Sequence, residues 1–345
     1  MDFELNEDQE ALAEGVAALC EGRFDIETVR LMATDGLDRG RWTELAQTGV
    51  FSLTRPEADG GLGMGWAEAV VVFEQLGRAL VPGPLVATTL TAALVGLADT
   101  TTIVETSGLD ATEIGEGAAE GSIVVGALQR CDGPCFVEFA GWVDGLVISD
   151  DEGLWWVEAE WLKAANAARA AHPLDPLTPV SVVSELPQGR RIADRNTAII
   201  WRQCGALLTS ALQLGIAAGA TDLAVEYAKQ REQFGKLIGA FQAVKHRCAD
   251  MITRVEVLRA AVYAAAVTVD GKGVDDPSRC VAVAKVLASS AAAACGKDAV
   301  QVHGGMGYTW EVDAHLYLKR AWVHDLAFGD GDEYAEQLAG GLLSG

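Results

Sequence analysis

The chain has 345 residues, half of them hydrophobic, and its 26 basic and 49 acidic residues give a formal net charge of −23. A hydrophobic content of this size can build a substantial core, which excludes a wholly disordered chain. The negative charge opposes binding to nucleic-acid phosphates and to anionic membrane surfaces, so we expect neither kind of partner. The length allows one large domain or two to three smaller ones.

Seven cysteines are scattered along the chain, a pattern unlike the disulfide frameworks of small secreted proteins. Cys131 and Cys135 form one isolated pair, and no second pair or nearby histidine completes a four-ligand zinc site, so no metal is expected. The N-terminal sequence Met1–Leu5 is acidic where a signal peptide is basic. The apolar run over residues 85–98 is too short and too rich in threonine to span a bilayer. We therefore expect a cytoplasmic protein.

The first zone, residues 1–120, has the pattern of helices. Asn6 followed by Gln9 is typical of a capped helix start. Apolar spacing predicts further helices over residues 41–49 and 66–80, separated by a glycine-rich turn at residues 56–63. This zone is therefore expected to form an N-terminal helical domain.

The second zone, residues 121–196, changes to short runs of β-branched and aromatic residues separated by Asp and Gly clusters. These runs predict a small antiparallel β domain. The expected strands cover residues 123–125, 135–137, 145–148, 154–157 and 180–183.

The third zone, residues 197–345, is helical again. Long stretches without internal proline predict helices over residues 204–229, 241–267 and 277–302. Gly215 and Gly219 are one turn apart, which allows a second helix to approach closely. Long helices joined by short loops favour an antiparallel bundle.

The first chemical motif lies between the first two of these long helices and contains Arg231, Gln233, Phe234 and Gln242. A cation and an amide donor on a loop can bind a pyrophosphate, and the following helix start adds backbone N–H donors. An ordinary polar turn between helices explains the same residues, so the residues by themselves leave both interpretations open.

The second motif reads Gln301-Val-His303-Gly304-Gly305-Met-Gly-Tyr and ends the third long helix. The glycine pair is an ordinary helix stop that also permits close approach of a cofactor. It does not follow a strand, so it is not a dinucleotide-binding fingerprint of the Rossmann type. For His303 we expect packing or a hydrogen bond to the backbone.

Together these motifs resemble the acyl-CoA dehydrogenases. Three further matches are His246-x-x-Ala-Asp-Met, the turn at residues 56–63, and Glu74-x-x-Gly77-Arg78. The resemblance covers nearly the whole chain in the family's order. It implies an α+β tetrameric flavoprotein with an N-terminal helical domain (1–120), a small middle β domain (121–196) and a C-terminal antiparallel four-helix bundle (197–345).

The resemblance also implies FAD as cofactor, lying between the β domain and the bundle. The family's residues for the ADP end of FAD, which lies partly across a subunit interface, fall on Arg231, Gln233, Phe234, Gln242, Gln301, Gly304 and Gly305. Arg231 would pair with the pyrophosphate and Phe234 would pack against the cofactor. Gly304 and Gly305 would admit it without a Cβ clash.

The family oxidises the Cα–Cβ bond of an acyl-CoA: a Glu removes the α-proton and the β-hydrogen leaves as hydride to the flavin. The two positions where members carry this Glu are Phe328 and Gly205 here, and neither can take a proton. Asp330, Asp332 and Glu333 follow the first position and are the candidate bases. The alternative is an acidic helix start with Asp332 as its N-cap.

A second departure lies in the β domain, because residues 126–135 lack the family's recognisable flavin and substrate segment. The leading hypothesis is therefore a base-lacking partner subunit in a heterotetramer of two acyl-CoA dehydrogenase subunits, suited to a bulky or steroid-type acyl-CoA. One alternative is a self-sufficient homo-oligomer with Asp330 or a nearby carboxylate as base. Another is a flavin-free structural or acyl-CoA-binding protein. The electron acceptor implied by the family is an electron-transferring flavoprotein.

Overall fold

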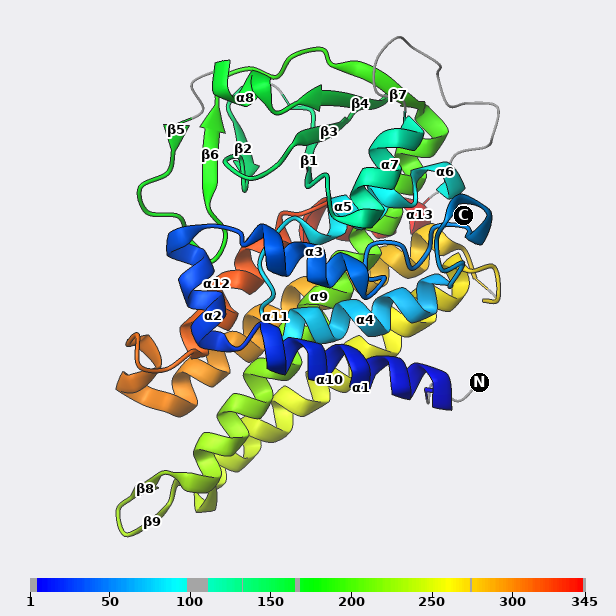
Figure 1. The fold of residues 1–345 in the computed structure, drawn as a ribbon. Coiled ribbons are helices and arrows are strands. Elements are labelled where there is room, and N and C mark those ends of the chain that lie inside the picture. The colour runs from blue at the N-terminus through cyan, green and yellow to red at the C-terminus, as the bar shows by residue number, and fades with distance from the viewer. Residues whose placement is uncertain (1–4, 98–110, 132, 165–167, 274, 344–345) are drawn as a thin grey trace. The chain divides into compact units, whose positions relative to one another are not determined.

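The computed structural model describes residues 5–97, 111–131, 133–164, 168–273 and 275–343 (Figure 1). The N-terminal residues 1–4 and the end of the apolar run at residue 98 lie outside this part of the chain. The chain divides into two compact units: unit 1 comprises Met1–Ile26, Val70–Val81 and Ala206–Gly345, and unit 2 comprises Glu27–Ala69 and Pro82–Gly205. The domain boundaries expected at residues 120 and 196 stay predictions.

Unit 1 is helical, and the three long helices predicted from sequence are confirmed in it. The first of them begins at Arg195 rather than at 204, because Asp194 Oδ1 accepts hydrogen bonds from the Thr197 amide at 2.9 Å and hydroxyl at 2.7 Å. The elements are α1 (Glu7–Arg23), α4 (Trp66–Arg78), α9 (Arg195–Gln230), β8 (Glu232–Gln233), β9 (Lys236–Leu237), η2 (Ile238–Ala240), α10 (Gln242–Val269), α11 (Pro277–His303), η3 (Gly304–Tyr308), α12 (Ala314–Asp325) and α13 (Gly331–Leu343); α4 and α9 each also extend into unit 2.

The predicted capped start of α1 is confirmed. The Asn6 side chain accepts from the Gln9 amide at 2.9 Å, and the Gln9 side chain accepts from the Asn6 amide at 3.2 Å. This reciprocal pair satisfies two N–H groups that the helix itself cannot satisfy.

Close packing of α4 against α9 explains the predicted role of the glycines. A Cβ on Gly215 would overlap the Glu74 carbonyl oxygen, and one on Gly77 would overlap the Leu212 carbonyl oxygen. One turn further along α9, a Cβ on Gly219 would lie 3.0 Å from the Arg78 carbonyl oxygen. The helices therefore approach at a distance that only glycine allows.

A buried ionic group ties α4 to α10. The Glu74 carboxylate accepts hydrogen bonds from Arg259 Nη2 at 2.8 Å and from the Tyr263 hydroxyl at 2.7 Å. Burial and the charge of Glu74 raise the pKa of Tyr263. Burial alone would lower the pKa of Arg259, but its bonds to Glu74 and Glu256 hold that pKa above its ordinary value. Breaking a buried group of this kind typically costs about 3–5 kcal/mol, so Glu74 acts as a structural residue.

Unit 2 contains two β-sheets, with strand orders β1-β3-β4-β7 and β2-β6-β5. The prediction of a wholly antiparallel domain is wrong in one pairing, because β1 runs parallel to β3. The chain passes through β2 of the other sheet between them, and such a crossover makes a parallel pairing possible. The elements of unit 2 are α2 (Ile26–Asp35), α3 (Arg39–Gln47), η1 (Glu57–Asp59), α5 (Leu85–Ala92), α6 (Leu94–Leu97), α7 (Ala111–Glu120), β1 (Val125–Gln129), β2 (Cys135–Glu138), β3 (Gly145–Ser149), β4 (Gly153–Glu158), α8 (Glu160–Ala164), β5 (Ala168–Arg169), β6 (Val180–Val183) and β7 (Arg190–Asp194).

Two helical segments are long and apolar enough to cross a membrane by length and composition, Arg195–Gln230 and Pro277–Tyr308. The apolar window of the first is wholly buried within the protein, and half of the second is buried. Core helices of a helical bundle have the same composition, so these segments are weak evidence for a membrane.

Candidate functional site

The loop between α9 and α10 is a tight β-hairpin formed by β8 and β9. Gln233 pairs with Lys236, which leaves Phe234 and Gly235 as a two-residue turn. Their φ angles of +56° and +77° are typical of a type I′ turn, in which Asn-Gly is the preferred sequence. A phenylalanine in the left-handed region is strained, so the sequence keeps Phe234 here at a cost in stability.

The Phe234 side chain is 92% exposed. Its ring meets the Phe241 ring edge-on with the centroids 6.2 Å apart, and Lys236 Nζ lies 4.3 Å from the Phe241 ring centroid. The contact with Phe241 leaves most of the Phe234 ring exposed, and the backbone of Phe234 is strained. The geometry indicates a surface that another molecule covers.

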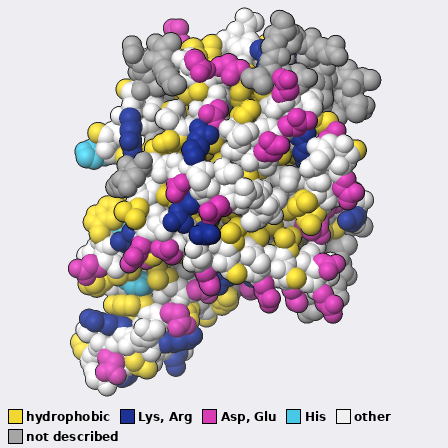
Figure 2. Space-filling model, viewed as in Figure 1, with side chains coloured by type: hydrophobic (Ala, Val, Ile, Leu, Met, Phe, Trp, Pro, Cys, Tyr) yellow, Lys and Arg dark blue, Asp and Glu magenta, His cyan; other side chains and the backbone are white. Residues whose placement is uncertain are grey.

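Positive charge gathers at this tip although the chain as a whole is acidic. Residues 229–247 contain five basic residues and one acidic residue, and Figure 2 shows dark-blue side chains at the lower left, where β8 and β9 of unit 1 lie in Figure 1. Lys229 is paired with Glu226 at 2.6 Å, and Arg247 with Asp298. The exposed Arg231 makes no ion pair with the described residues, so its guanidinium is available to an anion.

This motif has two glutamines: Gln233 lies two residues after Arg231, and Gln242 lies on the following helix. Gln233 Nε2 donates to the Glu232 carbonyl at 2.8 Å, which positions its amide within the hairpin. Gln242 is the first residue of α10, and its Nε2 lies 2.9 Å from His246 Nε2. The side chain of the N-cap residue, Phe241, makes no capping hydrogen bond. The first N–H groups of α10 can therefore donate to a ligand.

The second motif forms the end of α11 and the 3-10 helix η3. Gly304 has φ +60° and ψ −137°, a conformation essentially restricted to glycine. A Cβ on Gly304 or Gly305 would meet no atom within 4 Å, whereas one on Gly307 would lie 2.6 Å from the Val300 carbonyl oxygen. The first two glycines thus face open space, as a cofactor-binding role requires, and the third is needed for packing within the chain. Gln301 is exposed in the last turn of α11.

A ring contact links the C-terminal end of α9, which precedes the first motif, to the C-terminal end of α11, which carries the second. The Tyr227 ring, one turn before Arg231 on α9, stacks on the His303 ring with the centroids 4.2 Å apart. His303 Nδ1 lies 2.8 Å from the Ala299 carbonyl oxygen, and burial lowers its pKa. The predicted packing and backbone contact of His303 are confirmed. Arg231 follows Tyr227 by four residues, and Gly304 directly follows His303.

The turn from α12 to α13 holds the predicted base candidates. Asp330 Oδ1 accepts from the Glu333 amide at 2.8 Å, so Asp330 caps α13 and the prediction of Asp332 as the N-cap is wrong. Asp332 and Glu333 lie exposed in the first turn, where the helix dipole favours negative charge. Phe328 has φ +58° and its carbonyl accepts from the Tyr334 hydroxyl at 3.1 Å. The fold accounts for these carboxylates without a catalytic role.

Sequence reasoning missed Lys285, which organises this same turn. The side chain is fully buried, and Nζ donates to the carbonyls of His324 at 3.0 Å and Ala327 at 3.1 Å. Burial lowers the pKa of Lys285 to about 7, against the opposing effect of three carboxylates, Asp325, Asp330 and Glu333. The one available signal was a lysine inside the alanine- and valine-rich stretch of residues 281–288.

The second position expected for a base offers no carboxylate either. Gly205 is buried within α9, directly after the buried Cys204. Neither place at which the family carries its glutamate holds an acid in this chain. The described structure therefore leaves the base unassigned.

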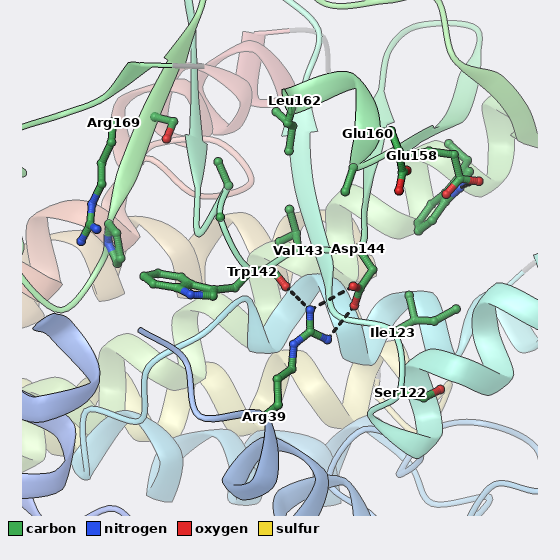
Figure 3. Close-up of a pocket in the computed structure, with 16 residues that line it drawn as sticks. Arg39, Ser122, Ile123, Trp142, Val143, Asp144, Glu158, Glu160, Leu162 and Arg169 are labelled. Carbon is green, nitrogen blue, oxygen red and sulfur yellow. Dashed lines mark hydrogen bonds and ion pairs between the residues drawn. The ribbon is translucent and has the colours of Figure 1, made fainter. Parts of the chain in front are cut away.

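Unit 2 contains a cavity of about 710 Å³ beside β3 and β4 (Figure 3). Arg39 donates to both carboxylate oxygens of Asp144 at 2.7 and 2.9 Å and to the Trp142 carbonyl at 2.6 Å, so its guanidinium is already engaged. The Arg169 guanidinium lies 5.9 Å from the Trp142 ring centroid. Cations and carboxylates both line this cavity, so its charge favours no particular ligand.

Comparisons with known proteins agree with the fold. Family models for the N-terminal and C-terminal domains of acyl-CoA dehydrogenases match residues 6–101 and 203–343. Acyl-CoA dehydrogenase IpdE2 of Mycolicibacterium smegmatis is 36% identical over 321 residues, covering 92% of this chain and 93% of that protein.

Two solved structures share the fold. One chain of the ChsE4–ChsE5 complex from Mycobacterium tuberculosis aligns with this protein over 100% of each of the two sequences, with a TM-score of 0.82 and 23% identity. The Tcur3481–Tcur3483 steroid acyl-CoA dehydrogenase variant aligns over 98% of both chains with a TM-score of 0.80 and 22% identity. The chain belongs to the acyl-CoA dehydrogenase family, a family of oxidoreductases.

Proposed function

We infer that this chain is the base-lacking subunit of a heterotetrameric acyl-CoA dehydrogenase and that it helps to hold the FAD of that assembly. The observation that carries the proposal is a contrast within unit 1. The Tyr227–His303 stack joins two motifs suited to an ADP group, whereas the α12–α13 turn has Phe328 where the family has its glutamate.

The residues present fit the ADP end of FAD. Arg231 would pair with the pyrophosphate, Phe234 would pack on the cofactor, and the open space at Gly304 and Gly305 would admit it. Gln233, Gln242 and Gln301 would donate amide hydrogen bonds to the same group. When bound, FAD supplies the acceptor for the hydride that leaves Cβ of the acyl-CoA.

The α-proton would be removed by a glutamate of the partner subunit, because neither family position in this chain carries one. Two relatives by fold support a paired assembly: one structure is a complex of ChsE4 with ChsE5, and the other is named a steroid acyl-CoA dehydrogenase with two components. A bulky or steroid-type acyl-CoA is therefore the substrate class we infer. We further infer a cytoplasmic location and an electron-transferring flavoprotein as electron acceptor.

The test is the amount of flavin bound per chain. The protein is purified alone and again after co-production with a full-length acyl-CoA dehydrogenase encoded by a neighbouring gene. Little flavin in the lone protein, about one flavin for every two chains in the complex, and turnover only by the complex are expected. One flavin per chain together with turnover by the lone protein would overturn the proposal in favour of a homo-oligomer that uses Asp330.

A further inference from the structure

Two thiols meet in the turn between β1 and β2. The Sγ atoms of Cys131 and Cys135 are 3.1 Å apart. Cys131 is exposed, whereas Cys135 opens β2 and is 3% exposed. Gly133 between them has φ +106°, and a Cβ there would meet no described atom within 4 Å, so Gly133 is not tightly packed. A disulfide requires the sulfurs to move about 1 Å closer.

The ends of this turn are anchored. Cys135 is paired with Val183 across β2 and β6. Arg130, directly before Cys131, donates to Asp150 at 3.1 Å and to the Pro187 carbonyl at 3.1 Å. Anchoring at both sides keeps the thiols together and lowers the entropy cost of joining them.

We propose that Cys131 and Cys135 form a reversible disulfide, with glutathione disulfide or another small disulfide as the oxidant. The Cys131 thiolate attacks one sulfur of the oxidant, breaks its S–S bond and releases one thiolate. The Cys135 thiolate then attacks Cys131 Sγ in the mixed disulfide, and the second thiolate leaves. Two protein thiols lose two protons and two electrons, and one disulfide is reduced to two thiols.

The order of attack follows from the surroundings of the two sulfurs. Burial, together with the hydrogen bond to Cys131, raises the pKa of Cys135 to about 11. The exposed Cys131 is therefore the attacking thiol and Cys135 the resolving one. A rise in pH accelerates the second step because more Cys135 becomes thiolate. The turn lies in the region that corresponds to the family's flavin and substrate segment, which residues 126–135 do not retain.

The pair is tested by equilibrating the purified protein with mixtures of reduced and oxidised glutathione, quenching with acid and alkylating the remaining thiols. Intact mass and peptide mapping are expected to show the loss of two hydrogen atoms between Cys131 and Cys135. In Cys135→Ser, one glutathione is expected to stay bound to Cys131, because the resolving thiol is missing. Cys131→Ser forms no internal disulfide.

Cys280→Ser is the matched control, because Cys280 is a partly exposed thiol on α11. This substitution is expected to leave the oxidation of Cys131 and Cys135 unchanged. If Cys135→Ser fails to fold, trapping of the wild-type mixed disulfide at short times decides the order of attack. A wild-type protein that stays a dithiol at every glutathione ratio overturns the proposal. So does a mixed disulfide on Cys131 that persists at equilibrium.

Discussion

The two ends of the C-terminal helices use their polar residues in opposite ways. At the α9–α10 hairpin and the end of α11, Arg231 lacks an ion pair among the described residues, Phe234 is strained and exposed, and Gly304 faces open space. At the α12–α13 turn, Asp330 caps a helix and Lys285 binds two carbonyls. We propose contact with another molecule for the first group, whereas residues whose bonds close within the chain are explained by stability.

The largest effect is expected on FAD binding, from removing the guanidinium of Arg231. Arg231→Ala should weaken FAD binding by the assembled complex about tenfold to hundredfold, because a hydrogen bond to a charged group contributes about 1.5–3 kcal/mol. Flavin fluorescence during titration of the apo complex measures the dissociation constant, and circular dichroism checks the fold.

Lys229→Ala is the control for this variant, since Lys229 is an exposed cation at the same tip that already pairs with Glu226. Its FAD affinity should match the wild type. Equal losses of FAD affinity in both variants would show a general charge effect. Unchanged FAD affinity in Arg231→Ala would contradict the proposal that Arg231 binds the pyrophosphate of FAD.

A smaller effect is expected at the α12–α13 turn, where the buried ammonium of Lys285 makes the free energy of unfolding depend on pH. The folded-state pKa of Lys285 is about 7, and the unfolded value is about 10.4, so the unfolded chain holds more protons between these values. The free energy of unfolding should therefore rise by about 1–2 kcal/mol between pH 7 and 8.5. Urea unfolding at several pH values measures this rise.

Lys285→Met should lose that pH-dependent rise, although it also leaves two carbonyls without their donor. Thiols that are buried when folded, such as Cys20, already ionise in the unfolded chain near pH 8.5 and act in the opposite direction, so the contribution of Lys285 is measured as the difference between wild type and this variant over the same pH range. If the free energy of unfolding changes with pH equally in wild type and Lys285→Met, the lowered pKa of Lys285 is contradicted.

Relief of strain in the hairpin gives a test with two readouts of opposite sign. Phe234→Asn places a preferred residue in the type I′ turn and should stabilise the free chain by about 1 kcal/mol. The same change should weaken flavin retention in the complex, because it removes the aromatic surface. Thermal unfolding and flavin occupancy are measured together, and a gain in stability with unchanged occupancy would limit Phe234 to a structural turn.

The smallest effect is expected from Asp330→Asn. Asparagine caps a helix about as well as aspartate, so the free energy of unfolding should change by less than about 0.5 kcal/mol. If the partner supplies the base, turnover of the complex stays within about twofold of wild type. A fall of about 10²–10⁴-fold would identify Asp330 as a general base and favour the homo-oligomeric alternative.

Local chemistry made much of this molecule predictable from sequence. The Asn6–Gln9 capping pair, the long helices and the close approach at Gly215 and Gly219 of α9 follow from spacing and residue type alone. The parallel pairing of β1 with β3 did not, because strand direction within a sheet depends on a crossover between distant segments. The N-cap of α13 was misplaced by two residues, since neighbouring aspartates satisfy the same pattern and the turn geometry selects one.

The sequence by itself determined the family, and it supplied the prediction of an ADP site, because both depend on motifs whose members lie within a few residues of one another. Only the tertiary structure showed that Tyr227 and His303 bring the two motifs together. It also revealed the buried Lys285 and the approach of Cys131 to Cys135. Burial and distance between side chains arise from packing, and packing sets the pKa, the strain and the reactivity that a residue's identity leaves open.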